Sequence, residues 1–473
     1  MKKIASLGKD FSQWYNRVVL QAQLADYSPV RGCMVIRPYG WAIWEQIQAG
    51  LDQMIKAAGV KNAYFPLFIP YSFLEKEKAH VKGFSPELAL VTHGGGKELK
   101  EPLVVRPTSE TIMYRMYAKW IQSYRDLPLK LNQWANVVRW ELRTYLFLRT
   151  MEFLWQEGHT AHANHQEAQE EVQRALLMYR DFYRDYLALE PFVGEKSERE
   201  RFAGALQTFS TEILVRDGKF VQAATSHDLG QNFSKTFEIQ FQDQDGQLKY
   251  VWQTSWGLST RAIGALIMAH GDDRGLILPP KVAPVQVVIV PIPGKTKEEK
   301  LREFIASVVR SLRGIRVEVD WREGLRPGYK FNDWELRGVP LRLEVGDRET
   351  REGAVTIVSR IDSEKLIVNS EKLKLKVDSL LAEFQNKLLG RYRQFVRKNT
   401  HLVNSWQEFR ETVEERRGAI LAHWCGSSDC EAAIKTETKA TTRVLPLTAK
   451  KEPGKCVWCN QAAQYRWVFG RGY

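Results

Sequence analysis

The stretch from Val137 to His159 constrains the fold most, because it holds two apolar runs separated by a polar break. The first run is β-branched and aromatic, the break is the segment ELRTYLFLRT, and the second run includes Phe153–Trp155. Such residues favour strands, and a polar break between them favours antiparallel pairing. The sequence therefore predicts two antiparallel strands joined by a long loop. Three charged side chains of this hairpin are expected to face one cleft: Arg139, Glu141 and Arg149.

The chemistry of this hairpin suits a nucleotide. Arginine on a strand is a rigidly held cation whose forked donors fit two oxygens of one phosphate. The charges alternate with Trp140, Phe153 and Trp155, so guanidinium groups are expected beside aromatic rings. A nucleotide site combines the same groups, since a base stacks on a ring while arginines hold the phosphates. The alternative interpretation is an ordinary surface hairpin with solvated arginines.

Composition sets broader limits on the chain. A sequence of 473 residues, 44% of them hydrophobic, is long enough for two or three domains with their own cores. The formal charge of +13 favours a polyanionic partner such as nucleic acid, although charge that only serves solubility is the alternative. No apolar run reaches about eighteen residues. Because polar residues also follow Met1–Lys3, the sequence indicates a cytosolic protein without a membrane span.

Upstream of the hairpin, the segment AYFPLFI at 63–69 predicts a buried strand interrupted by Pro66, and residues 71–102 are interpreted as a polar, glycine-bearing loop. A strand, a Pro-Thr-Ser-Glu turn and a helix follow. The turn places Thr108 and Glu110 at a strand end, where binding groups collect. Capping of the helix by Thr108 is a compatible interpretation.

Downstream of the hairpin, strands are expected at 209–215 and 219–225, joined by the hairpin signal Asp217-Gly218. The next residues, QAATSHDLGQNFSKTF, are interpreted as a polar loop at a strand end, with side chains that suit a sugar and a base edge. Arg261 begins an apolar helix. A cation at that place is unusual unless it meets an anion.

From residue 284 the sequence pattern changes to one that predicts alternating strands and helices. This pattern predicts a small α/β domain with a largely parallel sheet over roughly 284–385. Charged residues at its strand ends are either candidates for contacts with nucleic-acid bases or solvated surface: Arg342, Glu344 and Arg348.

Four of the five cysteines lie within the last fifty residues, as the pairs Cys425-x4-Cys430 and Cys456-x2-Cys459. Cys33 stands apart. Two closely spaced pairs can converge on a tetrahedral ion, and zinc fits four thiolates best. Because four cysteines leave no open coordination position, the predicted site is structural.

With these pieces in view, the chain resembles a class II aminoacyl-tRNA synthetase, and specifically prolyl-tRNA synthetases of the archaeal/eukaryotic-like type. The motifs that carry the resemblance occur in order along the chain: RPTSE (106–110), VVRWE (137–141), FLRTMEFLWQEGH (147–159), TSHDLGQNF (225–233) and SWGLSTR (255–261). The resemblance implies an α+β catalytic domain on an antiparallel sheet (1–283), an α/β anticodon-binding domain (284–388) and a small zinc-binding α+β domain (389–473). It also implies a homodimer formed around Pro38 and the helix after it, and a C-terminal Gly472-Tyr473 near the cleft.

The resemblance further implies attachment of L-proline to tRNA(Pro) in two steps through prolyl-adenylate, with Mg²⁺ accompanying ATP. Arg139 is expected to hold the α-phosphate and the proline carboxylate, and Arg261 the γ-phosphate. The ATP-binding set is Arg139, Glu141, Arg149, Thr150, Phe153, Gln222, Thr225, Ser259 and Arg261. The proline-binding set is Thr108, Glu110, Arg139, Trp155, Glu157, His159 and His227. His162 and His165 are assigned to the surface, and Arg342, Glu344 and Arg348 are weak candidates for anticodon binding.

Three points stay open at this stage. The stretch from Arg149 to Arg261 leaves no room for the editing domain of bacterial-type relatives, so no hydrolysis of mischarged alanine is expected. A synthetase of another specificity in the same subclass is one alternative. A synthetase-like tRNA-binding protein without aminoacylation activity is the other, although such proteins often lose the phosphate-binding arginines.

Overall fold

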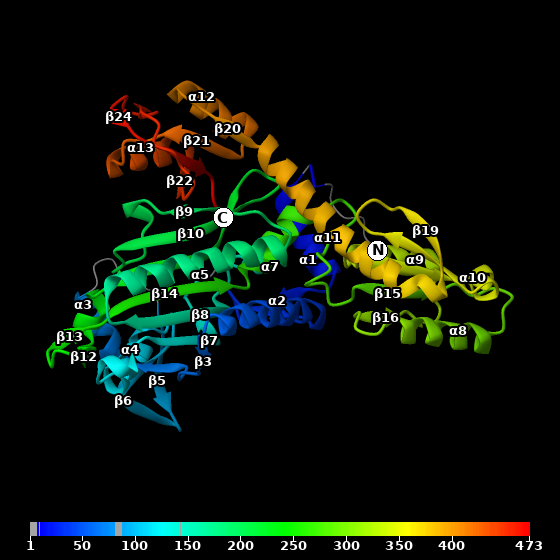
Figure 1. Cartoon of the computed structure of the whole chain (residues 1–473), viewed down its shortest axis with the longest axis horizontal. Helices are drawn as coiled ribbons and strands as arrows, with labels where there is room; N and C mark the ends of the chain where they lie inside the picture. Colours follow the sequence, from blue (N-terminus) through cyan, green and yellow to red (C-terminus); the bar gives the residue numbers. More distant parts are fainter. Residues whose placement is uncertain (1–6, 9, 81–87, 142) are drawn as a thin grey trace.

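The structure of the chain is a computed structural model that describes residues 7–8, 10–80, 88–141 and 143–473. Three bodies are visible in Figure 1: a large N-terminal body, a smaller α/β body beside it, and a C-terminal body above the first. The long helix α11 (Leu373–Lys398) connects the second body to the third and runs through residue 388, where the sequence places a domain boundary.

The N-terminal body is built on a long central sheet with the strand order β20-β21-β25-β22-β9-β10-β11-β14-β8-β7-β3. Its middle strands pair antiparallel with one another, as predicted for the hairpin. They are β7 (Leu129–Val138), β8 (Glu152–His162), β9 (Phe192–Glu195), β10 (Gln207–Leu214), β11 (Phe220–Gly230) and β14 (Trp252–Ser259).

One face of this sheet is covered by helices. Helix α5 (His165–Asp185) lies across β8, β10, β11 and β14, and the hydroxyl of Ser226 on β11 donates to the carbonyl of Val172 on α5 at 2.9 Å. Helices α2 (Pro38–Ala57) and α7 (Arg261–His270) complete the apolar core on this side. Side chains alternate along a strand. Thr225 and His227, the two neighbours of Ser226, therefore point to the opposite face of the sheet.

The remaining N-terminal elements correct two predictions. The strand expected at 63–69 with an interruption at Pro66 is present only at its end, as β4 (Phe68–Pro70), because the chain between β3 (Lys61–Asn62) and β4 is irregular on both sides of Pro66. The loop expected at 71–102 contains helix α3 (Tyr71–His80) and a hairpin, apart from 81–87, which lie outside the described residues. The hairpin strands are β5 (Ala89–Gly94) and β6 (Lys97–Val105), and its two turn glycines have positive φ, which glycine adopts without strain.

The polar segment after residue 222 is also a strand rather than a loop. β11 continues to Gly230 in the middle of the sheet, so its polar side chains belong to a binding face. The other elements of this body are α1 (Phe11–Gln21), β1 (Ala25–Tyr27), β2 (Met34–Ile36), α4 (Glu110–Trp120), α6 (Asn232–Thr236), β12 (Gln240–Gln242), β13 (Leu248–Tyr250) and the 3₁₀ turns Tyr124–Asp126 and Glu198–Glu200.

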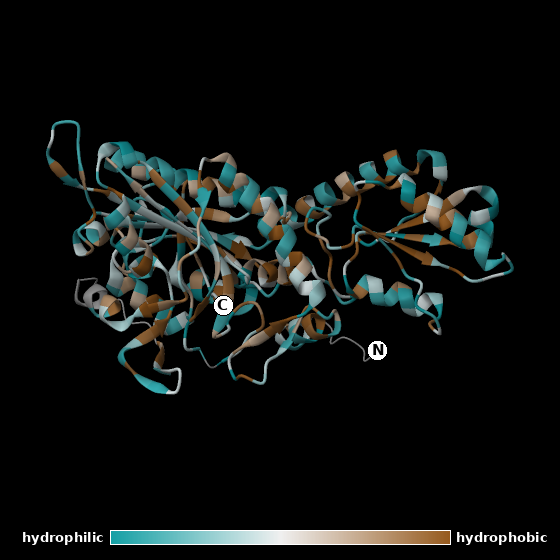
Figure 2. Cartoon of the chain, turned by 90° about the horizontal axis from the view of Figure 1, so that it is seen from below, coloured by the Kyte–Doolittle hydropathy of each residue, from teal (hydrophilic) through white to brown (hydrophobic). Residues whose placement is uncertain are grey.

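The second body has a mixed sheet of order β16-β15-β17-β18-β19. β15 (Val287–Pro291) is parallel to β16 (Val317–Val319) and β17 (Leu341–Val345), but β18 (Ala354–Ser359) and β19 (Lys365–Asn369) pair antiparallel. The expectation of a largely parallel sheet is therefore wrong, because connections too short for a crossover lead into β18 and β19. Figure 2 shows the hydrophobic strands of this body between its helices. The helices are α8 (Glu298–Ser311), α9 (Pro327–Leu336), α10 (Asp347–Glu352) and α11, and the 3₁₀ turn Ser370–Lys372 directly precedes α11.

The third body extends the central sheet. Strand β22 (Thr441–Pro446) pairs with β9 of the N-terminal body and with β25 (Arg466–Gly470). The body is completed by β20 (Thr400–Leu402), α12 (Trp406–Glu411), the π-helical turn Thr412–Arg416, β21 (Ala419–His423), α13 (Ser428–Thr438), β23 (Gly454–Lys455) and β24 (Ala462–Ala463). None of the helices in the described part of the chain combines the length and apolar character needed to cross a membrane.

Candidate active site

A cavity of about 280 Å³ opens on the face of the central sheet opposite α5. The strand register places the lining residues in rows. One row crosses four strands and contains Thr208, His227, Ser255 and His159. The next row contains Thr225, Gly257 and Glu157. Because Gly257 has no side chain, the space between its two neighbours stays open for a ligand.

A β-bulge brings Gln222 to the same face. The pairing of β10 with β11 shifts between Thr211 and Glu212, so that Ala223 is the extra residue and Gln222 lies opposite Glu212. Without the bulge, Gln222 would share the face of Ala224 rather than that of Thr225. Bulges beside binding sites commonly redirect one side chain in this way.

Two arginines supply positive charge to this cavity. Arg139, just after β7, donates from Nε to the carbonyl of Pro107 at 3.2 Å. Arg261, the first residue of α7, donates to the carbonyls of Leu148 at 3.3 Å and Gln222 at 3.5 Å. Burial, and then the charge of Arg139, lower the pKa of Arg261. Among the described residues neither guanidinium forms an ion pair, so the cleft attracts anions.

A second cavity of about 210 Å³ adjoins the first and shares Arg139, Phe153, Ser259 and Arg261 with it. Its other walls include three predicted ATP-binding residues: Glu141, Arg149 and Thr150. Arg149 and Glu141 approach each other at 3.4 Å, and the Thr150 hydroxyl donates to the carbonyl of Glu152 at 2.6 Å. All predicted ATP-binding residues thus line one of two connected hollows.

The aromatic part of the hairpin prediction needs one correction. The Arg139 guanidinium lies 5.4 Å from the ring centre of Phe153 and 5.5 Å from that of Trp155, as expected for charges beside aromatic rings. Trp140, in contrast, is 46% exposed and lines neither cavity. It follows the last residue of β7, beyond the regular alternation that orients the other two rings.

The predicted proline-binding residues all line the first cavity. At its inner end, the Thr108 hydroxyl donates to Glu110, which leaves the lone pairs of Thr108 and the other Glu110 oxygen as acceptors. Glu157 accepts from Ser109, from Gln133 at 2.9 Å and from His159 at 3.1 Å. Although burial opposes both charges, these hydrogen bonds lower the pKa of Glu157 and raise that of His159.

Other histidines are buried as neutral rings. Burial lowers the pKa of His227 to about 3, and its Nδ1 lies 3.0 Å from the Thr208 hydroxyl. His162 is buried, with a pKa lowered to about 4, so its assignment to the surface is wrong. Burial also lowers the pKa of His270 to about 3. His165 is partly exposed and lies 2.7 Å from a carboxylate oxygen of Asp228.

These neutral histidines predict a loss of stability in mild acid. An unfolded histidine binds a proton below pH about 6.5, whereas buried His227 does so only near pH 3. The unfolded state therefore gains protons first, and the free energy of unfolding falls as the pH falls below about 6.5, by about 1.4 kcal/mol for His227 at pH 5.5. In urea titrations at pH 7.5 and 5.5, His227→Gln should lose that much less than the unmodified chain. Replacement of the exposed His93 should leave the pH dependence unchanged, and identical slopes for all three would contradict the assignment.

The structure adds residues that the sequence did not single out. Glu200 and Phe202 come from the 3₁₀ turn Glu198–Glu200 and the residues just after it, and the Phe202 ring lies 4.7 Å from that of His227. Thr208, Ser255 and Trp256 lie on strands whose partners are distant in sequence. A known strand register would have found Thr208 and Ser255, since both occupy the row of His227. The sequence carries no comparable signal for Glu200 or Phe202.

The residues proposed for anticodon contacts lie in the second body, away from the cleft. Arg342 is buried, with its guanidinium 2.9 Å from Glu344, 3.3 Å from Glu335 and 4.2 Å from the Phe331 ring centre. It is therefore not solvated surface. Arg348 is half exposed and pairs with Glu349 at 2.8 Å.

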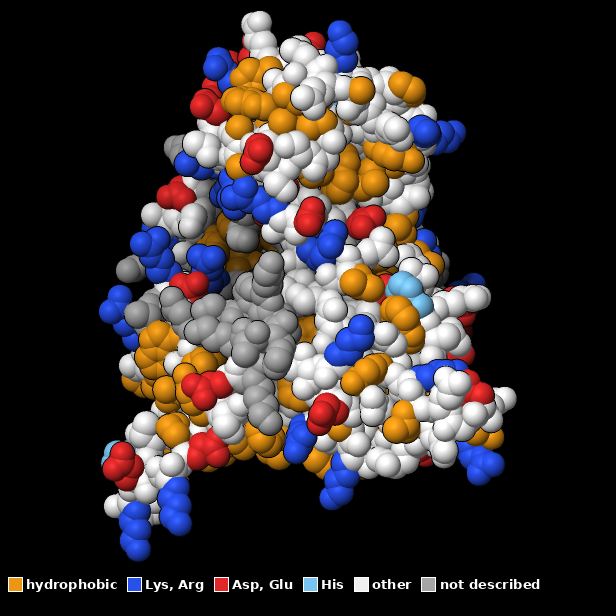
Figure 3. Space-filling model, turned by 90° about the vertical axis from the view of Figure 1, so that its left-hand side faces the viewer, with side chains coloured by type: hydrophobic (Ala, Val, Ile, Leu, Met, Phe, Trp, Pro, Cys, Tyr) orange, Lys and Arg blue, Asp and Glu red, His pale blue; other side chains and the backbone are white. Residues whose placement is uncertain are grey.

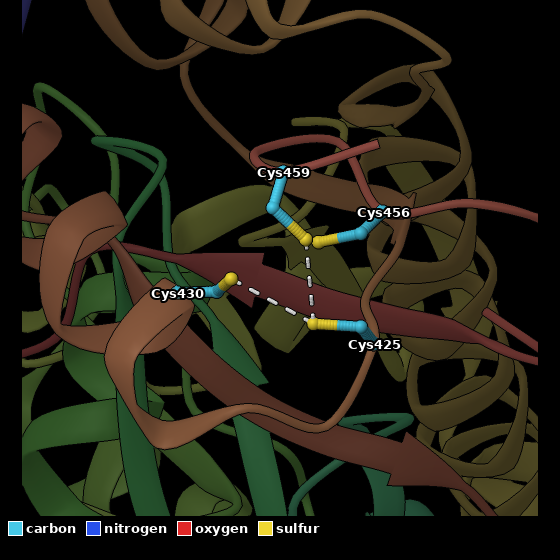
Figure 4. A group of neighbouring side chains, drawn as sticks. All are labelled: Cys425, Cys430, Cys456 and Cys459. Atoms are coloured by element: carbon cyan, nitrogen blue, oxygen red, sulfur yellow. Dashed lines mark hydrogen bonds between the residues drawn. The ribbon is translucent and has the colours of Figure 1, made fainter. Parts of the chain in front are cut away.

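Four cysteine sulfurs converge in the third body (Figure 4). Cys425 follows β21, Cys430 lies on α13, and Cys456 and Cys459 lie between β23 and β24. All four Sγ atoms lie within 4.8 Å of one another, and Cys425 is 3.7 Å from both Cys430 and Cys459. A tetrahedron with zinc–sulfur bonds of about 2.3 Å has sulfurs about 3.8 Å apart. The donor set therefore fits zinc.

The antiparallel sheet, with arginines from two motifs facing one cleft, defines a class II aminoacyl-tRNA synthetase. A family profile described as tRNA synthetase class II core domain (G, H, P, S and T) matches residues 91–270. Profiles described as anticodon binding domain and as prolyl-tRNA synthetase, C-terminal, match 286–387 and 406–473. The chain belongs to the prolyl-tRNA synthetase family and has the activity of a proline–tRNA ligase.

Individual relatives support this assignment over the full length. Proline–tRNA ligase of Natranaerobius thermophilus is 52% identical over 461 residues, 97% of this chain and 95% of the relative. That of Chlorobaculum tepidum is 53% identical over 480 residues, 100% of this chain and 99% of the relative. The relatives confirm the function that the resemblance implied and do not favour a tRNA-binding protein without activity.

Two solved structures confirm the predicted fold class. Prolyl-tRNA synthetase from Cryptosporidium parvum complexed with halofuginone and AMPPNP has a TM-score of 0.94 at 44% identity, covering 99% of this chain and 96% of its own. The same enzyme complexed with L-proline and AMP has a TM-score of 0.93 at 43% identity, again with 99% and 96% coverage. The class II core, the anticodon-binding domain and the C-terminal domain with its four cysteines all agree with the sequence prediction.

Proposed function

We propose that the two cavities bind ATP and L-proline side by side and use Arg139 and Arg261 to neutralise the phosphates during transfer. The main supporting observation is that both guanidinium groups line one cavity and, among the described residues, donate hydrogen bonds only to backbone carbonyls. The proline carboxylate attacks the α-phosphorus, the bond to the β-phosphate oxygen breaks, and pyrophosphate leaves. A carboxylate with a pKa of about 3.5 is already ionised, so the step needs no general base. Placement and charge neutralisation carry the catalysis.

Proline is proposed to occupy the inner end of the first cavity. Its secondary ammonium donates to Thr108 and Glu110, whose oxygens face the cavity, and its ring packs on Trp155. His227 stays neutral at working pH and adds no charge beside the ammonium. Glu157 and His159 are held by each other and support the wall of the pocket.

ATP is proposed to extend into the second cavity. Adenine stacks on Phe153, and Glu141 and Thr150 contact its edge. Gln222, Thr225 and Ser259 contact the ribose and phosphates, while Arg139 holds the α-phosphate, Arg261 the γ-phosphate, and Arg149 assists from the loop. Mg²⁺ enters with ATP as part of the substrate and neutralises phosphate charge. The relative crystallised with L-proline and AMP supports a cleft that holds both molecules.

The amino-acid specificity can be tested by pyrophosphate exchange. Purified protein is expected to exchange pyrophosphate into ATP in the presence of proline, and much more weakly with each other amino acid. The same preparation should leave alanyl-tRNA intact. A stronger response to threonine, or rapid hydrolysis of alanyl-tRNA, would contradict the proposal.

The resistance of alanyl-tRNA follows from the proposed archaeal/eukaryotic-like type, which has no editing insertion. Every residue from Arg149 to Arg261 is described, and these residues form strands β8 to β14, helices α5 and α6 and their connections within the catalytic body. These residues therefore belong to one catalytic domain.

We propose the same division into domains that the resemblance implied: a catalytic domain (1–283), an anticodon-binding domain (284–388) and a zinc-binding domain (389–473).

Assembly and partners complete the proposal. Large hydrophobic side chains are exposed near α2 and suit a homodimer interface: Tyr27, Val35, Trp41 and Tyr64. On the face shown in Figure 3, Lys and Arg side chains are spread over the surface, with Asp and Glu side chains interspersed among them. With a formal charge of +13, this distribution suits an extended polyanion, tRNA(Pro). We place the enzyme in the cytoplasm, with structural zinc at the four cysteines.

A further inference from the structure

Glu212 is a buried carboxylate at the edge of the catalytic cleft. It lies on β10 directly opposite Gln222, and its side chain has no exposed surface. Alternation along β10 puts it on the same face as Thr208, which lines the cavity. A buried negative charge next to a proposed triphosphate site opposes the binding of an anion unless neighbouring cations neutralise that charge.

The groups that hold Glu212 come from two domains. Arg443, on β22 of the C-terminal domain, donates from both Nε, at 3.0 Å, and Nη2 to one carboxylate oxygen. The other oxygen lies 3.3 Å from Lys196 Nζ and accepts from the Ser210 hydroxyl at 2.9 Å. Lys196 and Arg443 are themselves buried, so all the charges of this cluster are shielded from water.

Arg261 lies near Glu212 as well, in addition to Arg443 and Lys196. Burial and Arg139 lower the pKa of Arg261, and the charge of Glu212 opposes this by raising it. Arg261 also donates to the backbone carbonyl of Gln222, the residue opposite Glu212. In the structure the two guanidinium contacts to Glu212 come from Arg443, and among the described residues Arg261 forms no ion pair with it.

We propose that Arg443 is a positioning residue for ATP, because it holds Glu212 away from Arg261 and leaves that guanidinium free for phosphate. This inference rests on the proposed role of Arg261. Without Arg443, Glu212 keeps only the contacts of one oxygen, with Lys196 and Ser210, and its other oxygen turns towards Arg261. The triphosphate must then displace a buried carboxylate before it binds. The C-terminal domain thereby sets the positive charge available in the catalytic cleft.

The test is the Michaelis constant for ATP in proline-dependent pyrophosphate exchange. Arg443→Met is expected to raise KM for ATP about tenfold, as for loss of a buried charge-assisted contact, with KM for proline unchanged. The double variant Arg443→Met/Glu212→Gln should return KM for ATP towards the unmodified value, because the competing charge is gone. Glu212→Gln alone should not raise it, and Arg443→Lys should give an intermediate value.

A neighbouring cluster at the same domain contact provides a matched control. Glu431 is a buried carboxylate that accepts from Ser197, at 2.9 Å, and from Thr442. Glu431→Gln should leave KM for ATP unchanged even if it lowers the melting temperature. An equal rise in KM for Glu431→Gln and Arg443→Met, or no recovery in the double variant, would show a purely structural contact and overturn the inference.

The remaining outcomes of the experiment also support or overturn the inference. If Arg443→Met fails to fold, Glu212→Gln alone gives the answer, since a raised KM for ATP overturns the inference and an unchanged or lower KM supports it. Absence of proline-dependent exchange in the unmodified enzyme would refute the proposed function together with this inference. Normal exchange with an unmoved KM in Arg443→Met would refute this inference alone.

Discussion

Arg139→Ala is expected to slow prolyl-adenylate formation by about three orders of magnitude or more, because it removes a fixed cation from a cleft that shields charge from water. The guanidinium is held before substrate arrives, by Pro107 and by the rings of Phe153 and Trp155. It therefore needs no reorganisation when negative charge develops on the α-phosphate. The measurement is the rate of proline-dependent pyrophosphate exchange, supported by single-turnover formation of the adenylate.

The same loop offers a matched control for this substitution. Arg143 is exposed and lines neither cavity, so Arg143→Ala should change the exchange rate little. Arg139→Lys should recover only part of the rate, since an ammonium cannot contact two oxygens through a planar fork. Binding of tRNA should persist in Arg139→Ala, because the anticodon-binding domain is untouched. Unchanged exchange in Arg139→Ala would refute the assigned role.

The sequence was most informative where chemistry and strand periodicity coincide. Arg139, Phe153 and Trp155 sit around the hairpin of β7 and β8, whose alternation fixes which face each strand residue takes. Arg261 was singled out because a cation is rarely placed at the start of an apolar helix without an anion. The structure brings these residues into one cavity, while their individual roles in binding ATP and proline stay predictions.

The sequence was least informative where contacts are distant in the chain. The sequence around Glu212 gives no indication that its partner is Arg443, because β22 is brought next to β9 only by the folding of the third body. The polar strand β11 looked like a loop because a central strand usually carries apolar residues on both faces, and here one face binds ligand. The mixed sheet was missed because alternation of strands and helices suggested parallel crossovers throughout, whereas the connection from β17 to β18 holds only the six-residue helix α10 and is too short for one.

Loss of the zinc site is expected to have the second large effect, because the cysteine cluster connects segments of the third body that share little other regular structure. Cys456 and Cys459 lie between the two-residue strands β23 and β24, which form a very short pairing. Structural zinc sites contribute on the order of 10 kcal/mol to the folding of small domains. The short pairing of β23 and β24 cannot replace a contribution of that size, so loss of one thiolate is expected to destabilise this region strongly.

Cys456→Ser is accordingly expected to lower the zinc content from one ion per chain to near zero and to make the region after residue 406 sensitive to protease. Since β22 pairs with β9 and Arg443 contacts Glu212, the variant should also weaken ATP binding in the catalytic domain. Cys33→Ser is the control, because Cys33 lies outside the cluster and should leave zinc content, protease resistance and exchange unchanged. Metal analysis, limited proteolysis and pyrophosphate exchange measure the three effects. A Cys456→Ser protein that keeps its zinc and its protease resistance would show that these thiolates do not hold the domain together.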